Sequence, residues 1–133
     1  MKKKIKVLIV RSLYNDTSRL HNSAFKMLRK NKNISIKTVE VPGAFEIPVS
    51  ISRNLKKFDG FIAIGSIIKG KTPNFEFISK TITDALMLLS ITSKKPIGNA
   101  ILTCLNKKQS DLRHQKGKEA AEAVISVLND TKI

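Results

Sequence analysis

Residues near the middle of the chain have the types and spacing of an anion-binding site. An apolar, isoleucine-rich run over residues 61–68 is followed by turn and cationic residues: Lys69, Gly70, Lys71, Thr72 and Pro73. Thr72 can cap a helix and Pro73 fits a first helical position, so a helix is expected to start here with free backbone N–H groups. Such a start binds phosphate readily. An ordinary connection with two solvated lysines explains the same residues, and the local pattern alone favours it.

A second strand-to-helix turn is expected over residues 41–48, Val-Pro-Gly-Ala-Phe-Glu-Ile-Pro. Pro42 and Gly43 predict a turn, and Glu46 with Pro48 suits the start of a helix. The turn is expected to expose backbone donors together with Phe45 and Glu46 at one end of a sheet.

Strands and helices alternate along the chain. Strands are expected over residues 4–10, 34–41, 60–68 and 97–104, and helices over residues 17–30, after 46, after 72 to about 93, and over 117–129. A charged loop is expected between residues 104 and 117. The alternation predicts a flavodoxin-like, three-layer α/β/α fold with a four-stranded parallel sheet.

Ligands bind such sheets beyond the carboxyl ends of the strands. Four segments are expected to meet there: the loop with Tyr14, the turn at 43–46, residues 67–74, and the loop after Cys104. Tyr14 fits equally well as a ring at the edge of the core or as a lid over a ligand.

Length and composition indicate one globular domain spanning residues 1–133, with 41% hydrophobic and 26% charged residues. No apolar run approaches the roughly 20 residues that span a bilayer, so a cytoplasmic protein without membrane contact is expected. Cys104 is the only cysteine and there are two histidines. This set has no zinc spacing, so no metal is expected, and Cys104 is interpreted as a small buried or half-buried residue at a strand end.

The formal charge of +15 comes from 25 Lys and Arg against 10 Asp and Glu. Such a balance raises nucleic acid as a partner. The lysines are scattered in pairs at element ends, and aromatic residues make up only 5%. A solvated lysine-rich surface is therefore favoured over nucleic acid, and a substrate carrying phosphate is the next use for the charge.

The same motifs resemble the 6,7-dimethyl-8-ribityllumazine synthase family over nearly the whole chain. The resemblance rests on the stretch 41–48, the loop and helix start 64–77, the pair Tyr14-Asn15, and the segments containing Gly98-Asn99, Thr103, Arg113 and Lys116-Gly117. With this resemblance, an anion site over residues 63–77 becomes the favoured interpretation in place of an ordinary connection.

The resemblance implies a cofactor-independent transferase of riboflavin biosynthesis. It would condense 5-amino-6-(D-ribitylamino)uracil with 3,4-dihydroxy-2-butanone 4-phosphate, in a homopentamer with sites between subunits. Its implied substrate-binding residues are Tyr14, Ala44, Phe45, Glu46, Ile67, Ile68, Gly70, Lys71, Thr72, Asn99, Arg113 and Lys116. The neighbouring subunit would supply Asn99, Arg113 and Lys116.

Asn74 stands where the family carries a proton-shuttling histidine. An amide orients a substrate but exchanges no proton near neutral pH. The substitution predicts either a slow synthase that works by proximity or, alternatively, a catalytically impaired flavin-precursor binding protein of the same fold. A pentameric riboflavin synthase is a related alternative.

Two segments are shorter than the family's. The loop from Arg113 to Gly117 is abbreviated, which leaves Lys107 or Lys108 as alternative phosphate ligands and His114 as a surface histidine that could replace the missing one. The arm ahead of the first strand is nearly absent, and Leu13 replaces a usual arginine. Both segments bear on assembly, so a pentamer is expected rather than a larger shell.

Overall fold

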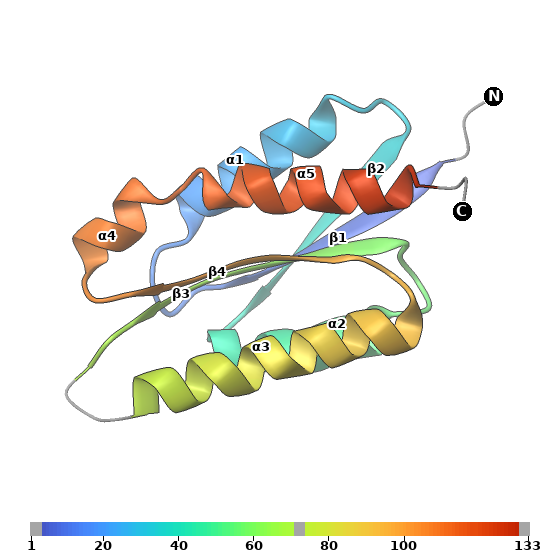
Figure 1. Cartoon of the computed structure of the whole chain (residues 1–133). Coiled ribbons are helices and arrows are strands. Elements are labelled where there is room, and N and C mark those ends of the chain that lie inside the picture. The colour runs from blue at the N-terminus through green and yellow to red at the C-terminus, as the bar shows by residue number, and fades with distance from the viewer. Residues whose placement is uncertain (1–3, 71–73, 131–133) are drawn as a thin grey trace.

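The computed structural model describes residues 4–70 and 74–130 (Figure 1). The elements run in the order β1 (Ile5–Ser12), α1 (Ser18–Arg29), β2 (Ile34–Val41), the 3-10 turn η1 (Ala44–Glu46), α2 (Ile47–Asn54), β3 (Gly60–Ile68), α3 (Asn74–Ser93), β4 (Ile97–Cys104), α4 (Lys107–Leu112) and α5 (Lys116–Leu128). None of these helices is long and apolar enough to cross a membrane.

The four strands form one parallel sheet in the order β2-β1-β3-β4. Helices α1 and α5 cover one face and α2 and α3 cover the other (Figure 1). This confirms the expected three-layer, flavodoxin-like α/β/α fold. The order reverses between β1 and β3, and the carboxyl ends of these two strands therefore mark the point where ligands bind in such sheets.

The central strands are apolar because both of their faces are buried. Alternate residues of β1 and β3, such as Ile9 and Ile62, pack against α1 and α5, while Leu8 and Phe61 pack against α2 and α3. A continuous apolar run is typical of a parallel strand in this position. Cys104 is 1% exposed at the end of β4, as expected.

Two glycines let α5 approach its neighbours closely. A Cβ atom on Gly98 would lie 2.6 Å from the carbonyl oxygen of Ala120, and one on Gly117 would lie 2.1 Å from that of Leu20. Any larger residue would have to move a backbone. Gly98 therefore leaves room for the close approach of α5, and Gly117 lets the start of α5 pack against α1.

The segment expected to be a charged loop after β4 contains a short helix, α4. Its capping residue is Asn106, whose Oδ1 accepts a hydrogen bond from the Gln109 backbone N–H at 2.9 Å. The Gln109 side chain accepts in return from the Leu105 N–H at 2.9 Å. These reciprocal bonds satisfy N–H groups at the helix start and replace the apolar periodicity that the segment lacks.

The turn after β2 is held by a carboxylate and not by glycine conformation. Gly43 has φ −142° and ψ 173°, which is extended backbone, and no glycine within residues 4–70 and 74–130 has positive φ. Glu46 Oε1 accepts a hydrogen bond from the Gly43 N–H at 2.9 Å. Gly70 likewise has no positive φ. The predicted cap at Thr72 and Pro73 lies outside the described residues.

Candidate functional site

Buried polar side chains gather at the carboxyl end of the sheet. Those that are buried within the described part of the chain are Ser12, Thr17, Ser66 and Ser110. Ser12 ends β1, Ser66 lies near the end of β3, Thr17 precedes α1, and Ser110 lies on α4. Buried hydroxyl groups need hydrogen-bond partners, so this end of the molecule has a fixed polar lining.

The loop after β1 is held by its own polar residues. Thr17 Oγ1 donates to the Ser12 carbonyl at 2.8 Å and accepts from Arg11 Nε at 3.2 Å. Asp16 Oδ1 accepts from the Ser18 hydroxyl at 2.7 Å and from its N–H at 3.0 Å. These bonds, the hydroxyl one first, lower the pKa of the Asp16 carboxyl. These two hydrogen bonds stabilise the ionised form of Asp16 at the start of α1.

Tyr14 projects from this loop and is 86% exposed. The ring therefore does not lie at the edge of the core of this chain, and its use as a lid over a ligand stays a prediction. Tyr14 borders a hollow of about 210 Å³ together with Asn15, Ser66, Lys107 and Asp111. An exposed aromatic ring beside a polar hollow can stack on a planar ligand.

Two hydrogen bonds join the loop, β3 and α4 at the point where the strand order reverses. Asn15 Nδ2 donates to the Ser66 carbonyl at 2.7 Å. The Ser66 and Ser110 hydroxyl groups lie 2.6 Å apart. Neither Ser66 nor Ser110 was expected at the site from the sequence. The sequence feature that could have indicated this pair was Ser66, a polar residue in an otherwise isoleucine-rich strand.

The η1 turn packs against the end of β3. A Cβ atom on Gly65 would lie 3.1 Å from Ser12 Oγ and 3.4 Å from Ala44 Cβ, so glycine here lets the turn approach. Ala44 is half-buried, and Phe45 is 65% exposed beside it. Glu46 is half-buried, and its bond to Gly43 fixes the carboxylate at the rim of the turn. The three predicted residues therefore lie next to β1 and β3.

The predicted phosphate segment begins at the end of β3. Ile67 and Ile68 are half-buried, and the Lys69 N–H donates to the Cys104 carbonyl at 2.9 Å. Gly70 is exposed, and no atom would lie within 4 Å of a Cβ placed on it. Asn74 is exposed at the start of α3. The predicted ligands Lys71 and Thr72 lie outside the described residues.

The three residues expected from a neighbouring subunit are all exposed. Asn99 lies in the outermost strand, paired in register with Ala63, and its Oδ1 accepts from the Ile101 N–H at 3.0 Å. Arg113 ends α4 and Lys116 begins α5. The register holds Asn99 several residues short of the carboxyl edge, and the chain does not bring it to Tyr14 and Ala44.

Lys107, an alternative phosphate ligand, and His114, a possible replacement for the missing histidine, lie in different parts of the fold. Lys107 borders the same hollow as Tyr14. His114 lies between α4 and α5, on the layer that packs with α1, whereas α3 begins at Asn74 on the opposite face of the sheet (Figure 1). Within one chain, His114 and Asn74 therefore belong to different layers. No group of three potential metal ligands occurs in residues 4–70 and 74–130.

The chain is a doubly wound parallel α/β protein with buried hydroxyl groups and an exposed Tyr14 near the switch point of its sheet. The family model for 6,7-dimethyl-8-ribityllumazine synthase matches residues 4–132, and the chain belongs to that family.

Relatives bearing that name cover most of the chain. The protein from Bdellovibrio bacteriovorus is 34% identical over 97% of this chain and 76% of its own length. The protein from Bartonella tribocorum is 36% identical over 96% and 91%. The one from Blochmanniella pennsylvanica is 36% identical over 99% and 90%.

Proposed function

We propose that the chain catalyses the condensation of 5-amino-6-(D-ribitylamino)uracil with 3,4-dihydroxy-2-butanone 4-phosphate, releasing phosphate and water. The observation that carries this proposal is the convergence of the loop with Tyr14, the turn Ala44–Glu46 and the end of β3 at one edge of the sheet. These are the segments in which the sequence resembles the family's substrate contacts.

The pyrimidine would bind between the β1 loop and the η1 turn. The Tyr14 ring, 86% exposed, offers a stacking surface, and Phe45, 65% exposed, adds apolar area. Glu46 and the half-buried residues Ile67 and Ile68 at the end of β3 would contact the edge of the pyrimidine ring. A planar ligand that covers these rings would remove exposed apolar surface from water, which favours binding.

The phosphate would bind at residues 70–72, where Gly70 is open to solvent. Lys71 and Thr72 are proposed as ligands on their sequence, together with Arg113. A guanidinium group can donate two parallel hydrogen bonds to a phosphate, which makes Arg113 a stronger ligand than a lysine. Lys107 and Lys108 remain the alternative ligands, and Lys107 already borders the hollow beneath Tyr14.

We propose that the site is completed between subunits of a homopentamer. Asn99, Arg113 and Lys116 are exposed, and the strand register holds Asn99 away from Tyr14, so a neighbouring copy would bring its own set to this edge. The exposed side of α3 supports assembly. Phe77, Leu88 and Ile91 are 72%, 62% and 63% exposed there, at spacings that place them along one side of the helix.

Catalysis by this site would rest mainly on holding two reactants together. Fixing an amine beside a ketone contributes about 7–11 kcal/mol at best. Asn74, exposed at the start of α3, can donate and accept hydrogen bonds but cannot shuttle a proton. The proposal is therefore a slow synthase, in which proton transfers pass through water or phosphate.

The test uses purified protein with both substrates, following product absorbance and phosphate release together. One phosphate is expected per product formed. Arg113→Gln is expected to raise KM for the butanone phosphate about tenfold or more, whereas Lys108→Gln, at an alternative ligand, is expected to leave it unchanged. If Lys108→Gln alone raises KM, the lysines of α4 hold the phosphate. Tight binding of the pyrimidine without any product would identify a binding protein of the same fold.

A further inference from the structure

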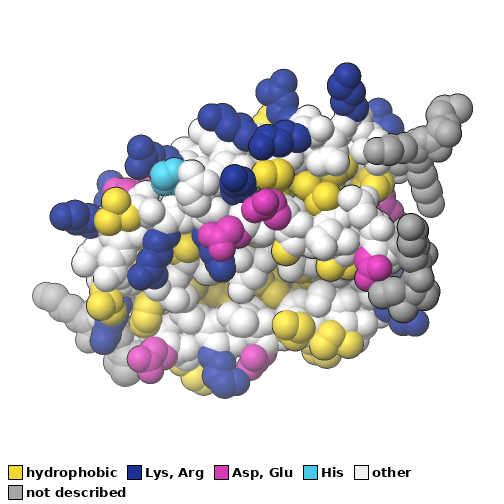
Figure 2. All heavy atoms as spheres, turned by 45° about the horizontal axis from the view of Figure 1, so that its top comes forward, with side chains coloured by type: hydrophobic (Ala, Val, Ile, Leu, Met, Phe, Trp, Pro, Cys, Tyr) yellow, Lys and Arg dark blue, Asp and Glu magenta, His cyan; other side chains and the backbone are white. Residues whose placement is uncertain are grey.

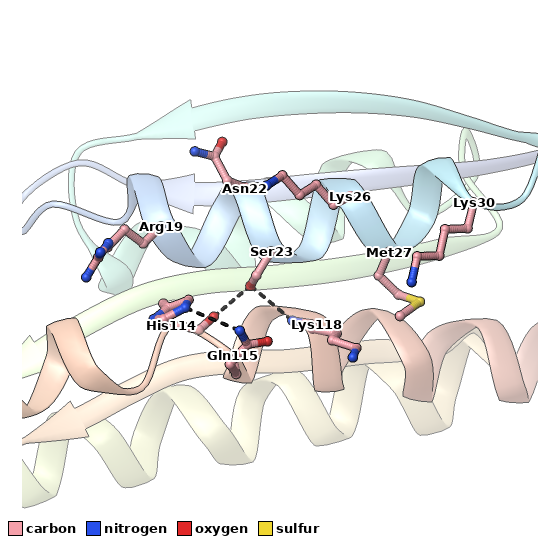
Figure 3. Close-up of a pocket in the computed structure, with 9 residues that line it drawn as sticks. All are labelled: Arg19, Asn22, Ser23, Lys26, Met27, Lys30, His114, Gln115 and Lys118. Atoms are coloured by element: carbon pink, nitrogen blue, oxygen red, sulfur yellow. Dashed lines mark hydrogen bonds between the residues drawn. The ribbon is translucent and has the colours of Figure 1, made fainter.

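A basic pocket lies between α1 and α5, on the layer opposite to α3. It has a volume of about 360 Å³ and is lined by four cationic side chains, Arg19, Lys26, Lys30 and Lys118, with Ser23 and His114 among the other lining residues. Figure 3 shows the three α1 cations spread along that helix and Lys118 across the gap on α5. Figure 2 shows Lys and Arg side chains gathered over this layer.

The pocket is built on a rigid contact between the two helices. Ser23 Oγ donates to the His114 carbonyl at 2.6 Å and accepts from the Lys118 N–H at 3.1 Å. Gly117 lets the α5 backbone approach the Leu20 carbonyl, where even a Cβ would lie 2.1 Å away. The floor is therefore fixed before any ligand arrives, which lowers the entropy cost of binding.

The positive charge of the pocket is not neutralised by the described residues. The ion pairs in residues 4–70 and 74–130 are Arg11 with Glu40 and Lys80 with Asp84, and neither includes a cation of the pocket. None of the described lining residues is acidic. Concentrated like charges in a concave site raise the local concentration of anions.

The spacing of the cations indicates the shape of the ligand. Arg19, Lys26 and Lys30 follow one side of α1 over a rise of about 17 Å, which is longer than a single phosphate needs. Met27 is the apolar lining residue, and no Phe, Tyr or Trp ring lines the pocket among the described residues, so the stacking surface for a base is limited to the His114 imidazole. The pocket suits a chain of phosphates better than a nucleobase.

We propose that this pocket binds an oligophosphate, meaning a compact ligand with three or more linked phosphates. The proposal does not depend on the condensation reaction, because its cations lie on α1 and α5 and none of them is assigned to the substrate site. Binding can therefore fail or succeed independently of turnover.

The experiment measures binding of inorganic triphosphate to the whole chain by isothermal titration calorimetry at low salt. Triphosphate is expected to bind at least about tenfold more tightly than inorganic monophosphate. Lys26→Gln with Lys118→Gln is expected to weaken triphosphate binding about tenfold. The matched control, Lys56→Gln with Lys57→Gln, removes the same charge after α2 and is expected to change the affinity less than twofold. Circular dichroism confirms folding of both variants, whose changed side chains are exposed.

Three results would overturn the proposal. Equal weakening by both double variants would show that only the overall charge attracts the ion. Equal affinity for triphosphate and monophosphate would show that the row of cations does not act together. Displacement of triphosphate by single-stranded RNA at a lower phosphate concentration would identify nucleic acid as the occupant.

Discussion

Replacing Ser110 by alanine tests whether the buried hydroxyl pair holds the candidate site together. Ser66 and Ser110 are 5% and 7% exposed, and their hydroxyl groups lie 2.6 Å apart. Ser110→Ala removes one partner and leaves the Ser66 hydroxyl buried without it. A buried group stranded in this way costs about 1–3 kcal/mol. For a chain of 133 residues this lowers Tm by about 4–11 °C.

The assay compares the unaltered chain with four variants by chemical denaturation at one protein concentration. Ser110→Ala and Ser66→Ala are each expected to lose about 1–3 kcal/mol, while the double variant loses much less than the sum, because neither hydroxyl is then stranded. Ser126→Ala is the control, since Ser126 is exposed on α5 and should change stability by under about 0.5 kcal/mol.

The double-variant comparison decides whether the reasoning holds. If the two single effects add within about 0.5 kcal/mol, the hydroxyl groups do not act as a pair, and the account of the site's polar lining is wrong. If they couple, Ser110→Ala is also expected to raise KM for the butanone phosphate, because Ser110 lies on the short helix that Arg113 caps at its carboxyl end.

Three further predictions concern catalysis, assembly and pH. Asn74→His is expected to raise kcat about 10²-fold or more if proton transfer limits the reaction, and an unchanged kcat would remove position 74 from the mechanism. Leu88→Glu on the exposed side of α3 is expected to reduce the oligomer measured by light scattering, whereas Ser126→Glu on the opposite layer leaves it intact; equal effects would refute an interface at α3. Burial, and then the Arg11 charge, lower the pKa of His21, whose Nε2 lies 2.8 Å from Thr38 Oγ1. The unfolded chain then binds the proton more readily, so stability should be full above about pH 6.5 and fall below it, and His21→Gln should flatten that slope in denaturation curves.

The layers of the fold were predictable because their signals are periodic. The apolar runs of β1 and β3 and the amphipathic pattern of α1 each reflect burial against a neighbouring element. Helix α4 was missed because its six residues carry no apolar stripe. Its signal was the spacing of Asn106 and Gln109, whose side chains cap the first turn reciprocally.

The candidate site was predictable in its segments but not in its bonding. Strand order brought Tyr14, Ala44 and the end of β3 to one edge, as expected for a parallel sheet. The bond from Asn15 to Ser66 and the pair Ser66 with Ser110 join residues far apart in sequence, so no local pattern reports them. The basic pocket could not be predicted from the sequence either, because its cations come from two helices that only packing brings together.

The most direct test of the central claim is the steady-state rate of lumazine formation by the unaltered chain, with both substrates saturating. Proximity without a titrating group predicts product formation well above the spontaneous reaction at equal concentrations, with little dependence on pH near neutrality. A rate no greater than the spontaneous one would contradict the claim that this edge of the sheet holds both reactants for condensation.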